Sequence, residues 1–176
     1  MKHQTGKVLI LGMGNEILTD DGIGIKLTWE IQKQIIHPDV EFDSLSIGGL
    51  EIIEFLSPYD TVIILDAIKT LNGIPGSVYR FIPDDFKSTL HIDNLHDISF
   101  LNALKVGEKL GIKTPSNIQI IAIEIVEDLV FGDEFSPQVQ ERWEDINVEV
   151  KEIILSILSK ELKIKGVQFQ LNQPTG

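Results

Sequence analysis

Two adjacent aspartates, Asp20 and Asp21, stand in the glycine-flanked segment GMGNEILTDDGIG (12–24), directly behind the apolar run KVLIL (7–11). Paired carboxylates of this kind suit metal binding and acid–base chemistry. A third carboxylate, Asp66, follows a second apolar run. Because the carboxyl ends of neighbouring parallel strands meet at one edge of a sheet, we expect Asp66 to lie near the pair. The sequence therefore predicts a shared site for a metal or another electrophile.

Two carboxylates call for a third ligand, and histidine is the usual partner for nickel, zinc, copper or iron. The chain has four candidates: His3, His37, His91 and His96. His3 lies in the N-terminal tail and His37 in a turn before a proline, while the other two lie in STLHIDNLHDIS. His96 starts a predicted helix, so its ring can point back over the loop face of the sheet. A single loop histidine is more often a surface residue than a ligand, so these patterns leave the third ligand open.

Two other interpretations of the acidic loop remain open. Gly12 and Gly14 begin a partial dinucleotide-binding pattern, but Ile17 occupies the third glycine position and two aspartates would face a pyrophosphate. Acidic residues that could contact a ribose follow at the appropriate distance: Asp39, Glu41 and Asp43. The structural alternative is that Asp20 or Asp21 caps the helix that begins near Gly22.

The elements that must position these residues alternate between strand and helix patterns. Strands are predicted at 7–11, 40–45, 61–67, 76–82 and 117–125, with 61–67 central and 76–82 at an edge; helices are predicted at 22–36, 49–57, 96–110 and 136–160. His37–Pro38 is expected to end the first helix, Gly111 to end the third, and Ser136 to cap the fourth. This order predicts an α/β fold, a three-layer α/β/α sandwich with a mostly parallel sheet flanked by helices, as in phosphorylases and hydrolases. We expect one domain over 1–160 and a frayed tail over 161–176.

Composition narrows the functional classes. The 176 residues include no cysteine, which removes disulfides, thiolate metal sites and a cysteine nucleophile. A formal net charge of −12 disfavours nucleic acid as a partner. We expect no membrane partner, because no apolar run approaches membrane-spanning length, and the N-terminal apolar stretch is too short for a signal peptide. We therefore expect a cytoplasmic protein, and the acidic surface and low aromatic content favour a monomer.

Four segments together resemble the [NiFe]-hydrogenase maturation endopeptidases. They are GMGNEILTDDGIG, VIILDA, HDISFLNAL and IEIVEDLVFGDEFSPQV, and their order and spacing fit the family over roughly residues 6 to 158. The acidic pair after G-x-G-N is an unusual feature, and its combination with LDA and FGDEFSP is specific. The tail beyond about residue 160 is not covered.

The resemblance implies an enzyme that removes a short C-terminal extension from the hydrogenase large-subunit precursor after nickel has been inserted. Three residues, matched to the family's metal-contacting and catalytic positions, are implied to meet that metal: Asp21, Asp66 and His96. Many members carry Glu where Asp21 stands, which changes the reach by one methylene. The nickel is expected to come from the substrate, and no organic cofactor is implied.

The family also carries an acidic residue next to a glycine pair after the second strand. This chain offers Asp43, Gly48 and Gly49, with a longer gap than the usual run. These residues are candidates for substrate contact, because a glycine pair lets a substrate chain approach the backbone closely. They serve equally well as plain glycines at a helix entry.

Ligand identity alone does not choose between nickel and zinc, and the general base stays open between Asp66 and a metal-bound water. Two rival functions remain. A non-catalytic assembly chaperone for the hydrogenase would use the same three residues. A nucleotide-binding protein would instead bind NAD or ATP and be indifferent to nickel.

Overall fold

The computed structural model describes residues 6–46, 51–85 and 95–162. Within them a five-stranded sheet has the order β2-β1-β3-β5-β4. Its strands are β1 (Val8–Met13), β2 (Val40–Leu45), β3 (Thr61–Ile68), β4 (Val78–Phe81) and β5 (Asn117–Glu124). Four of the strands are parallel and β4 pairs antiparallel with β5 at one edge. The predicted mostly parallel sheet, with 76–82 as an edge strand, is confirmed.

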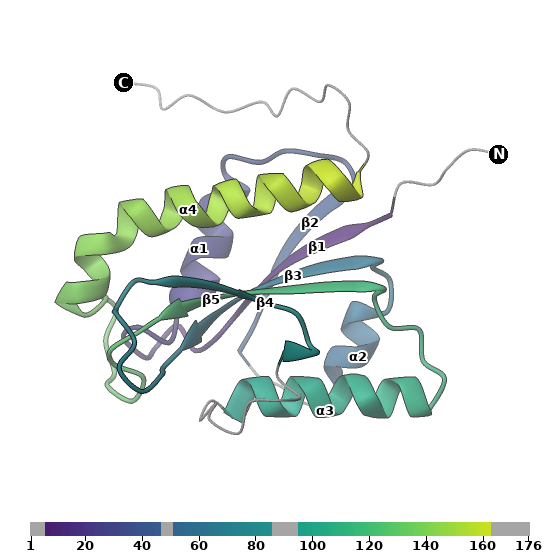
Figure 1. Cartoon of the computed structure of the whole chain (residues 1–176), viewed down its shortest axis with the longest axis horizontal. Helices are drawn as coiled ribbons and strands as arrows, with labels where there is room; N and C mark the ends of the chain where they lie inside the picture. Colours follow the sequence, from purple (N-terminus) through teal and green to yellow (C-terminus); the bar gives the residue numbers. More distant parts are fainter. Residues whose placement is uncertain (1–5, 47–50, 86–94, 163–176) are drawn as a thin grey trace.

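Helices cover both faces of the sheet, which confirms the three-layer α/β/α sandwich (Figure 1). They are α1 (Ile23–Gln32), α2 (Glu51–Leu56), α3 (Leu95–Lys109) and α4 (Pro137–Glu161). Helices α1 and α4 lie on one face, and α2 and α3 on the other. None of the helices in the described ranges is long and apolar enough to cross a membrane.

Strand β1 shows how the sequence builds two cores from one run of apolar residues. Val8 and Ile10 pack into the cluster beneath α1 and α4, while Leu9 and Leu11 pack into the cluster above α2 and α3. Alternate residues of a strand point to opposite faces, so a strand covered on both faces must be apolar throughout. Strand β3 is buried at all eight positions, which confirms it as the central strand.

The helix ends explain where the predicted boundaries hold and where they fail. Helix α1 ends at Gln32, so the expectation that His37–Pro38 ends it is wrong. The chain tightens after Gln32, where the amides of Gln34 and Ile35 both donate to the carbonyl of Ile31. Ile35 still packs in the core at 2% exposure, which extended the apolar periodicity beyond the real helix.

Gly111 ends α3 as predicted. Its φ of +71° is the left-handed conformation that glycine adopts without strain. The amide of Ile112 donates to the carbonyl of Gly107, and the amide of Gly111 donates to that of Glu108. These two bonds form a Schellman motif, which satisfies carbonyls at the helix end.

The amino edge of the sheet carries a polar cluster whose contribution to stability should depend on pH. The Tyr59 hydroxyl donates to Glu41 Oε2 at 2.6 Å, and Lys7 Nζ donates to Glu41 Oε1 at 3.2 Å. Burial and the neighbouring Glu41 carboxylate raise the pKa of Tyr59 from 10.0 to about 12. The hydrogen bonds from Tyr59 and Lys7 lower the pKa of Glu41.

We expect an ultraviolet phenolate titration of the native protein to contain a component near pH 12, absent from Tyr59→Phe. Because the folded pKa is raised, the stabilisation that Tyr59 confers is complete below pH 10 and disappears as the pH rises to about 12. At neutral pH the variant should lose about 1 kcal/mol of unfolding free energy through the lost hydrogen bond. An unchanged alkaline titration in Tyr59→Phe would contradict the assignment.

Candidate functional site

The glycines of the acidic loop are required by close packing. Gly14 has a φ of +131°, and a Cβ there would overlap the carbonyl oxygen of Asp21. A Cβ at Gly24 would overlap the carbonyl of Leu65 and lie 2.5 Å from that of Met13. Helix α1 therefore begins in direct contact with the ends of β1 and β3. Protein atoms fill the space beside these glycines, so the glycine pattern is explained without a bound dinucleotide.

Replacing Gly14 by Ala should destabilise the protein by about 2–3 kcal/mol, because the new Cβ meets both a disfavoured φ and the Asp21 carbonyl. Gly111→Ala is the matched control, since its φ is +71° but nothing lies within 4 Å of the added Cβ. The control should lose only the conformational part, about 1 kcal/mol. Urea denaturation of both variants measures the difference. Equal losses would show that the Gly14–Asp21 contact is unimportant.

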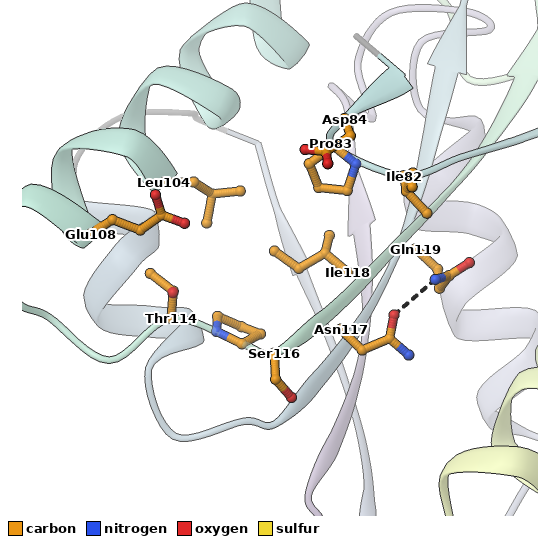
Figure 2. Close-up of a pocket in the computed structure, with 11 residues that line it drawn as sticks. Ile82, Pro83, Asp84, Leu104, Glu108, Thr114, Ser116, Asn117, Ile118 and Gln119 are labelled. Atoms are coloured by element: carbon orange, nitrogen blue, oxygen red, sulfur yellow. Dashed lines mark hydrogen bonds between the residues drawn. The ribbon is translucent and has the colours of Figure 1, made fainter. Parts of the chain in front are cut away.

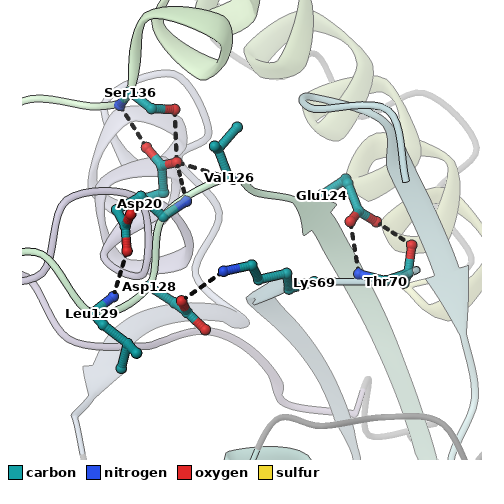
Figure 3. Close-up of polar contacts among 9 residues, drawn as sticks. Asp20, Lys69, Thr70, Glu124, Val126, Asp128, Leu129 and Ser136 are labelled. Carbon is teal, nitrogen blue, oxygen red and sulfur yellow. Dashed lines mark hydrogen bonds and ion pairs between the residues drawn. The ribbon is translucent and has the colours of Figure 1, made fainter. Parts of the chain in front are cut away.

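Asp20 is fully buried and joins the first loop to the loop after β5 (Figure 3). Its Oδ2 accepts hydrogen bonds from the amides of Val126 (3.1 Å) and Glu127 (3.0 Å) and from the Ser136 hydroxyl (2.7 Å). Its Oδ1 accepts from the Ser136 amide at 2.7 Å. Asp20 is thus an acceptor in four hydrogen bonds, which suits an ionised carboxylate.

This network corrects the expected helix caps. The N-cap of α1 is Gly22, so neither Asp20 nor Asp21 occupies the N-cap position that the structural alternative assigned to one of them. The Asp20 side chain accepts its hydrogen bonds from the loop 126–136 instead. Ser136 does occupy the N-cap position of α4, with Pro137 as the first helical residue. Its hydroxyl donates to Asp20 and makes no cap hydrogen bond. The side chains of Asp20 and Ser136 therefore hold the loop after β1 against the loop after β5.

Asp21 and Asp66 lie on neighbouring elements at the carboxyl edge of the sheet. Asp21 is half-buried in the loop that joins β1 to α1. Asp66 is 3% exposed near the end of β3, and its Oδ1 accepts from the Ala67 amide at 2.8 Å. The pairing of Leu65 with Gly12 places β3 beside β1. The predicted meeting of the two strand ends is thus present.

His96 lies in the first turn of α3, as predicted. Figure 1 shows that α3 begins on the side of the sheet where β1, β3 and β5 end. The first turn of α3, which contains His96, therefore lies on the side of the sheet that carries Asp21 and Asp66. The His96 side chain lies outside the described part of the structure. Among the side chains that are described, no group of three or more His, Asp or Glu residues is arranged to hold a metal.

The candidate substrate-contact residues lie on or after the edge strand β2. Asp43 is exposed there, and its Oδ1 accepts from the amide of Ser44 at 2.7 Å. Gly48 and Gly49 fall outside the described residues. Asp43 is thus accessible to a partner, and its role in substrate contact stays a prediction.

Two contacts that the sequence analysis did not single out fix the loop after β3 (Figure 3). The buried carboxylate of Glu124, on β5, accepts from the Thr70 amide at 2.7 Å and from the Thr70 hydroxyl at 2.9 Å. Lys69 Nζ lies 2.9 Å from Asp128 Oδ1, and this hydrogen bond raises the pKa of Lys69. In the sequence, the feature that could have indicated this contact is Glu124, a lone acidic residue inside an apolar strand. The loops that follow β1, β3 and β5 are therefore linked by buried or partly buried carboxylates.

A separate pocket lies at the opposite end of β5, between β4 and α3 (Figure 2). It has a volume of about 390 Å³, and its lining includes Ile82, Leu104, Glu108 and Ile118. Asn117 and Gln119 also line it and are joined by a 2.8 Å hydrogen bond. This pocket contains none of the predicted site residues.

The fold and the site together indicate the class of protein. Ligands of open parallel α/β sheets bind beyond the carboxyl ends of the strands. Here that edge carries two carboxylates on neighbouring elements, one of them buried, and the start of a helix with a histidine. This arrangement is that of an α/β protein with a polar site at the carboxyl edge of its sheet, as in many hydrolases.

The chain belongs to the hydrogenase maturation protease family, because the sequence profile of that family matches residues 46–154. The resemblance noted in the sequence is thereby confirmed. The chain is 25% identical over 141 residues to the hydrogenase expression/formation protein HupD of Thiocapsa roseopersicina. The matched segment covers 77% of this chain and 62% of that protein. The chain is 34% identical over 73 residues to the hydrogenase 2 maturation protease of Escherichia coli, covering 41% of this chain and 44% of that protein. The chain thus spans less than two thirds of both relatives.

Solved structures share the fold. The hydrogenase maturating endopeptidase HybD from E. coli matches with a TM-score of 0.70 at 23% identity, over 88% of this chain and 93% of that one. The [NiFe] hydrogenase maturation protease HybD from Thermococcus kodakarensis matches with a TM-score of 0.62 at 24% identity, over 86% and 98%. At these identities the match concerns the fold alone, and it agrees with the architecture described above.

Proposed function

We propose that this protein is an endopeptidase that removes the C-terminal extension of a nickel-loaded [NiFe]-hydrogenase large-subunit precursor. Membership of the hydrogenase maturation protease family is the observation that carries this proposal. The placement of Asp21 and Asp66 on adjacent elements at the carboxyl edge supports it, because a protease site needs convergent polar groups at an accessible edge.

In this proposal Asp21, Asp66 and His96 contact the nickel that the substrate carries. Two carboxylates and an imidazole form an oxygen and nitrogen donor set that nickel accepts. Asp66 suits this role because the Ala67 amide holds its Oδ1 and thereby fixes the carboxylate orientation. The half-buried position of Asp21 leaves that residue accessible to an incoming polypeptide.

Peptide hydrolysis requires a polarised carbonyl, an activated water and a proton for the leaving amine. A bound divalent metal supplies Lewis acidity to such a site. We assign Asp66 to accept the proton from the attacking water and return it to the amine, because it is the more buried of the two carboxylates. Asp21 then orients the substrate at the mouth of the site.

If the protein recognises the nickel rather than a peptide sequence, its specificity is a difference between the nickel-loaded and the nickel-free state of one substrate. A precursor without nickel would lack the group that the three side chains contact. Discrimination between such states depends on the difference between two binding free energies. The protein would then cleave only after metal insertion is complete.

Product mass tests the proposed activity. The purified protein is incubated with the large-subunit precursor of the same organism, and the precursor is weighed by intact mass spectrometry. Loss of a C-terminal peptide is the expected result. A stable complex with an intact precursor would instead identify a non-catalytic assembly chaperone, and neither cleavage nor binding would remove the hydrogenase precursor as the substrate.

A further inference from the structure

Exposed apolar side chains are concentrated at the carboxyl edge of the sheet. Of ten large apolar residues exposed in the described part of the chain, six lie on the loops that follow β1, β3 and β5: Ile17, Leu71, Ile74, Leu129, Val130 and Phe131. Exposed apolar residues scattered singly need no explanation, whereas a cluster at one place marks an interaction site. This edge is also the one that carries Asp21 and Asp66.

Four of these residues lie on two paired backbone segments that we name the apolar platform: Ile17, Leu129, Val130 and Phe131, which are 58%, 79%, 53% and 75% exposed. Their backbones are paired across the first and third loops. The Thr19 amide donates to the carbonyl of Val130 at 2.9 Å, and the Gly132 amide donates to that of Ile17 at 3.2 Å. Leu18 and Phe131 form an antiparallel bridge between the same segments.

The platform is held in place from beneath by the Asp20 network. Asp20 accepts from the amides of Val126 and Glu127, which lie just before the platform, and from Ser136, which follows it. Figure 3 shows Leu129 pointing away from this network. Because the backbone is fixed, the apolar side chains stay exposed instead of folding back onto the protein.

The border of the platform is acidic. Glu16, Asp133 and Glu134 are exposed beside it. Lys26 of α1 and Lys69 of the loop after β3 are already engaged. Lys26 Nζ donates to the Asp133 carbonyl at 2.7 Å and lies 4.2 Å from the centre of the Phe135 ring. Lys69 pairs with Asp128. Charge complementarity therefore favours a partner whose apolar surface is bordered by lysine or arginine.

We propose that the apolar platform docks an apolar, basic-bordered surface of the large-subunit precursor and so brings its C-terminal extension to Asp21 and Asp66. The inference rests on the proposed function, since the precursor is the polypeptide that must reach these carboxylates. Ile17 precedes Asp21 by four residues in the same loop, so a partner on the platform lies next to the site. Binding energy gathered away from the reacting bond positions the substrate.

The double variant Leu129→Ser/Phe131→Ser tests the platform. Both side chains are largely exposed, so its thermal unfolding should match that of the native protein. Leu110→Ser is the matched control, because Leu110 is 68% exposed and follows α3 at the opposite end of the sheet. Cleavage rates are measured against precursor concentration for the three proteins. We expect KM to rise about tenfold or more in the double variant, with kcat unchanged, and no change in the control.

A charge variant tests the border. Neutralising Glu16, Asp133 and Glu134 as Glu16→Gln/Asp133→Asn/Glu134→Gln should slow association with the precursor and weaken its dependence on salt. Stopped-flow binding at several salt concentrations gives both quantities. Identical salt dependence in native protein and variant would remove the basic border from the proposal.

The outcomes separate this proposal from the proposed function. If the native protein cleaves the precursor and the double variant does so with an unchanged KM, the platform is not the docking surface and the proposed activity stands. If the native protein neither binds nor cleaves the precursor, the proposed function fails first. If the native protein is a dimer and the double variant is a monomer, the platform binds a second copy of the chain and the precursor is the wrong partner.

Discussion

Replacing Asp66 by Asn should lower the cleavage rate by about 10²–10³-fold while the protein stays folded. The change removes a buried negative charge from the site, and an effect of this size is typical when one electrostatic contributor is lost. The amide oxygen of Asn can still accept from the Ala67 amide, so the local backbone is retained. Single-turnover cleavage of the precursor gives the rate, and thermal unfolding monitors the fold.

The matched control is Glu124→Gln, which neutralises another buried carboxylate on the neighbouring strand. Both oxygens of Glu124 accept hydrogen bonds from Thr70, and we assign them no part in the reaction. This variant should lose stability and keep its cleavage rate per folded molecule. Equal loss of cleavage in the two variants would mean that the burial of a charge, and not its place at the carboxyl edge next to the Asp21 loop, decides activity.

Asp20→Ala should destabilise the protein by about 3–5 kcal/mol, because several donors lose their acceptor at about 1–3 kcal/mol each. The truncation leaves the amides of Val126, Glu127 and Ser136 without their acceptor. A buried donor that loses its partner costs more than an average hydrogen bond contributes. Chemical denaturation measures the loss, and hydrogen exchange of these three amides should accelerate.

Asp133→Ala is the control for this loop, because its side chain is exposed and only its backbone carbonyl contacts Lys26. A surface change of this kind should stay within about 0.5 kcal/mol of the native protein. A similarly small change in Asp20→Ala would refute the view that this carboxylate holds the loops at the carboxyl edge together.

The adjacent aspartates show what the sequence can and cannot predict. Their unusual placement in a glycine loop identified the segment, and the apolar runs identified the strands that carry it. The sequence did not show which aspartate has which role, because the partner that decides the role of Asp20 is Ser136, 116 residues away. Asp20 is enclosed by that distant loop, while Asp21 stays half-buried in its own loop.

Local patterns predicted elements wherever burial followed a simple period. Strand β2 begins and ends where predicted, and β3 reads as an unbroken apolar run because helices cover both of its faces. The predicted first helix was too long because Ile35 continues the helical spacing from a turn that also faces the core. Contacts between loops, such as that of Glu124 with Thr70, follow no local period and appear only once the sheet is assembled.

The most direct test of the account compares nickel-loaded with nickel-free precursor. Each is incubated with the native protein and with His96→Ala, and the large subunit is weighed by intact mass spectrometry. We predict loss of a C-terminal peptide only from the nickel-loaded precursor and only with the native protein. Cleavage of the nickel-free precursor at the same rate would contradict the claim that Asp21, Asp66 and His96 contact the nickel carried by the substrate.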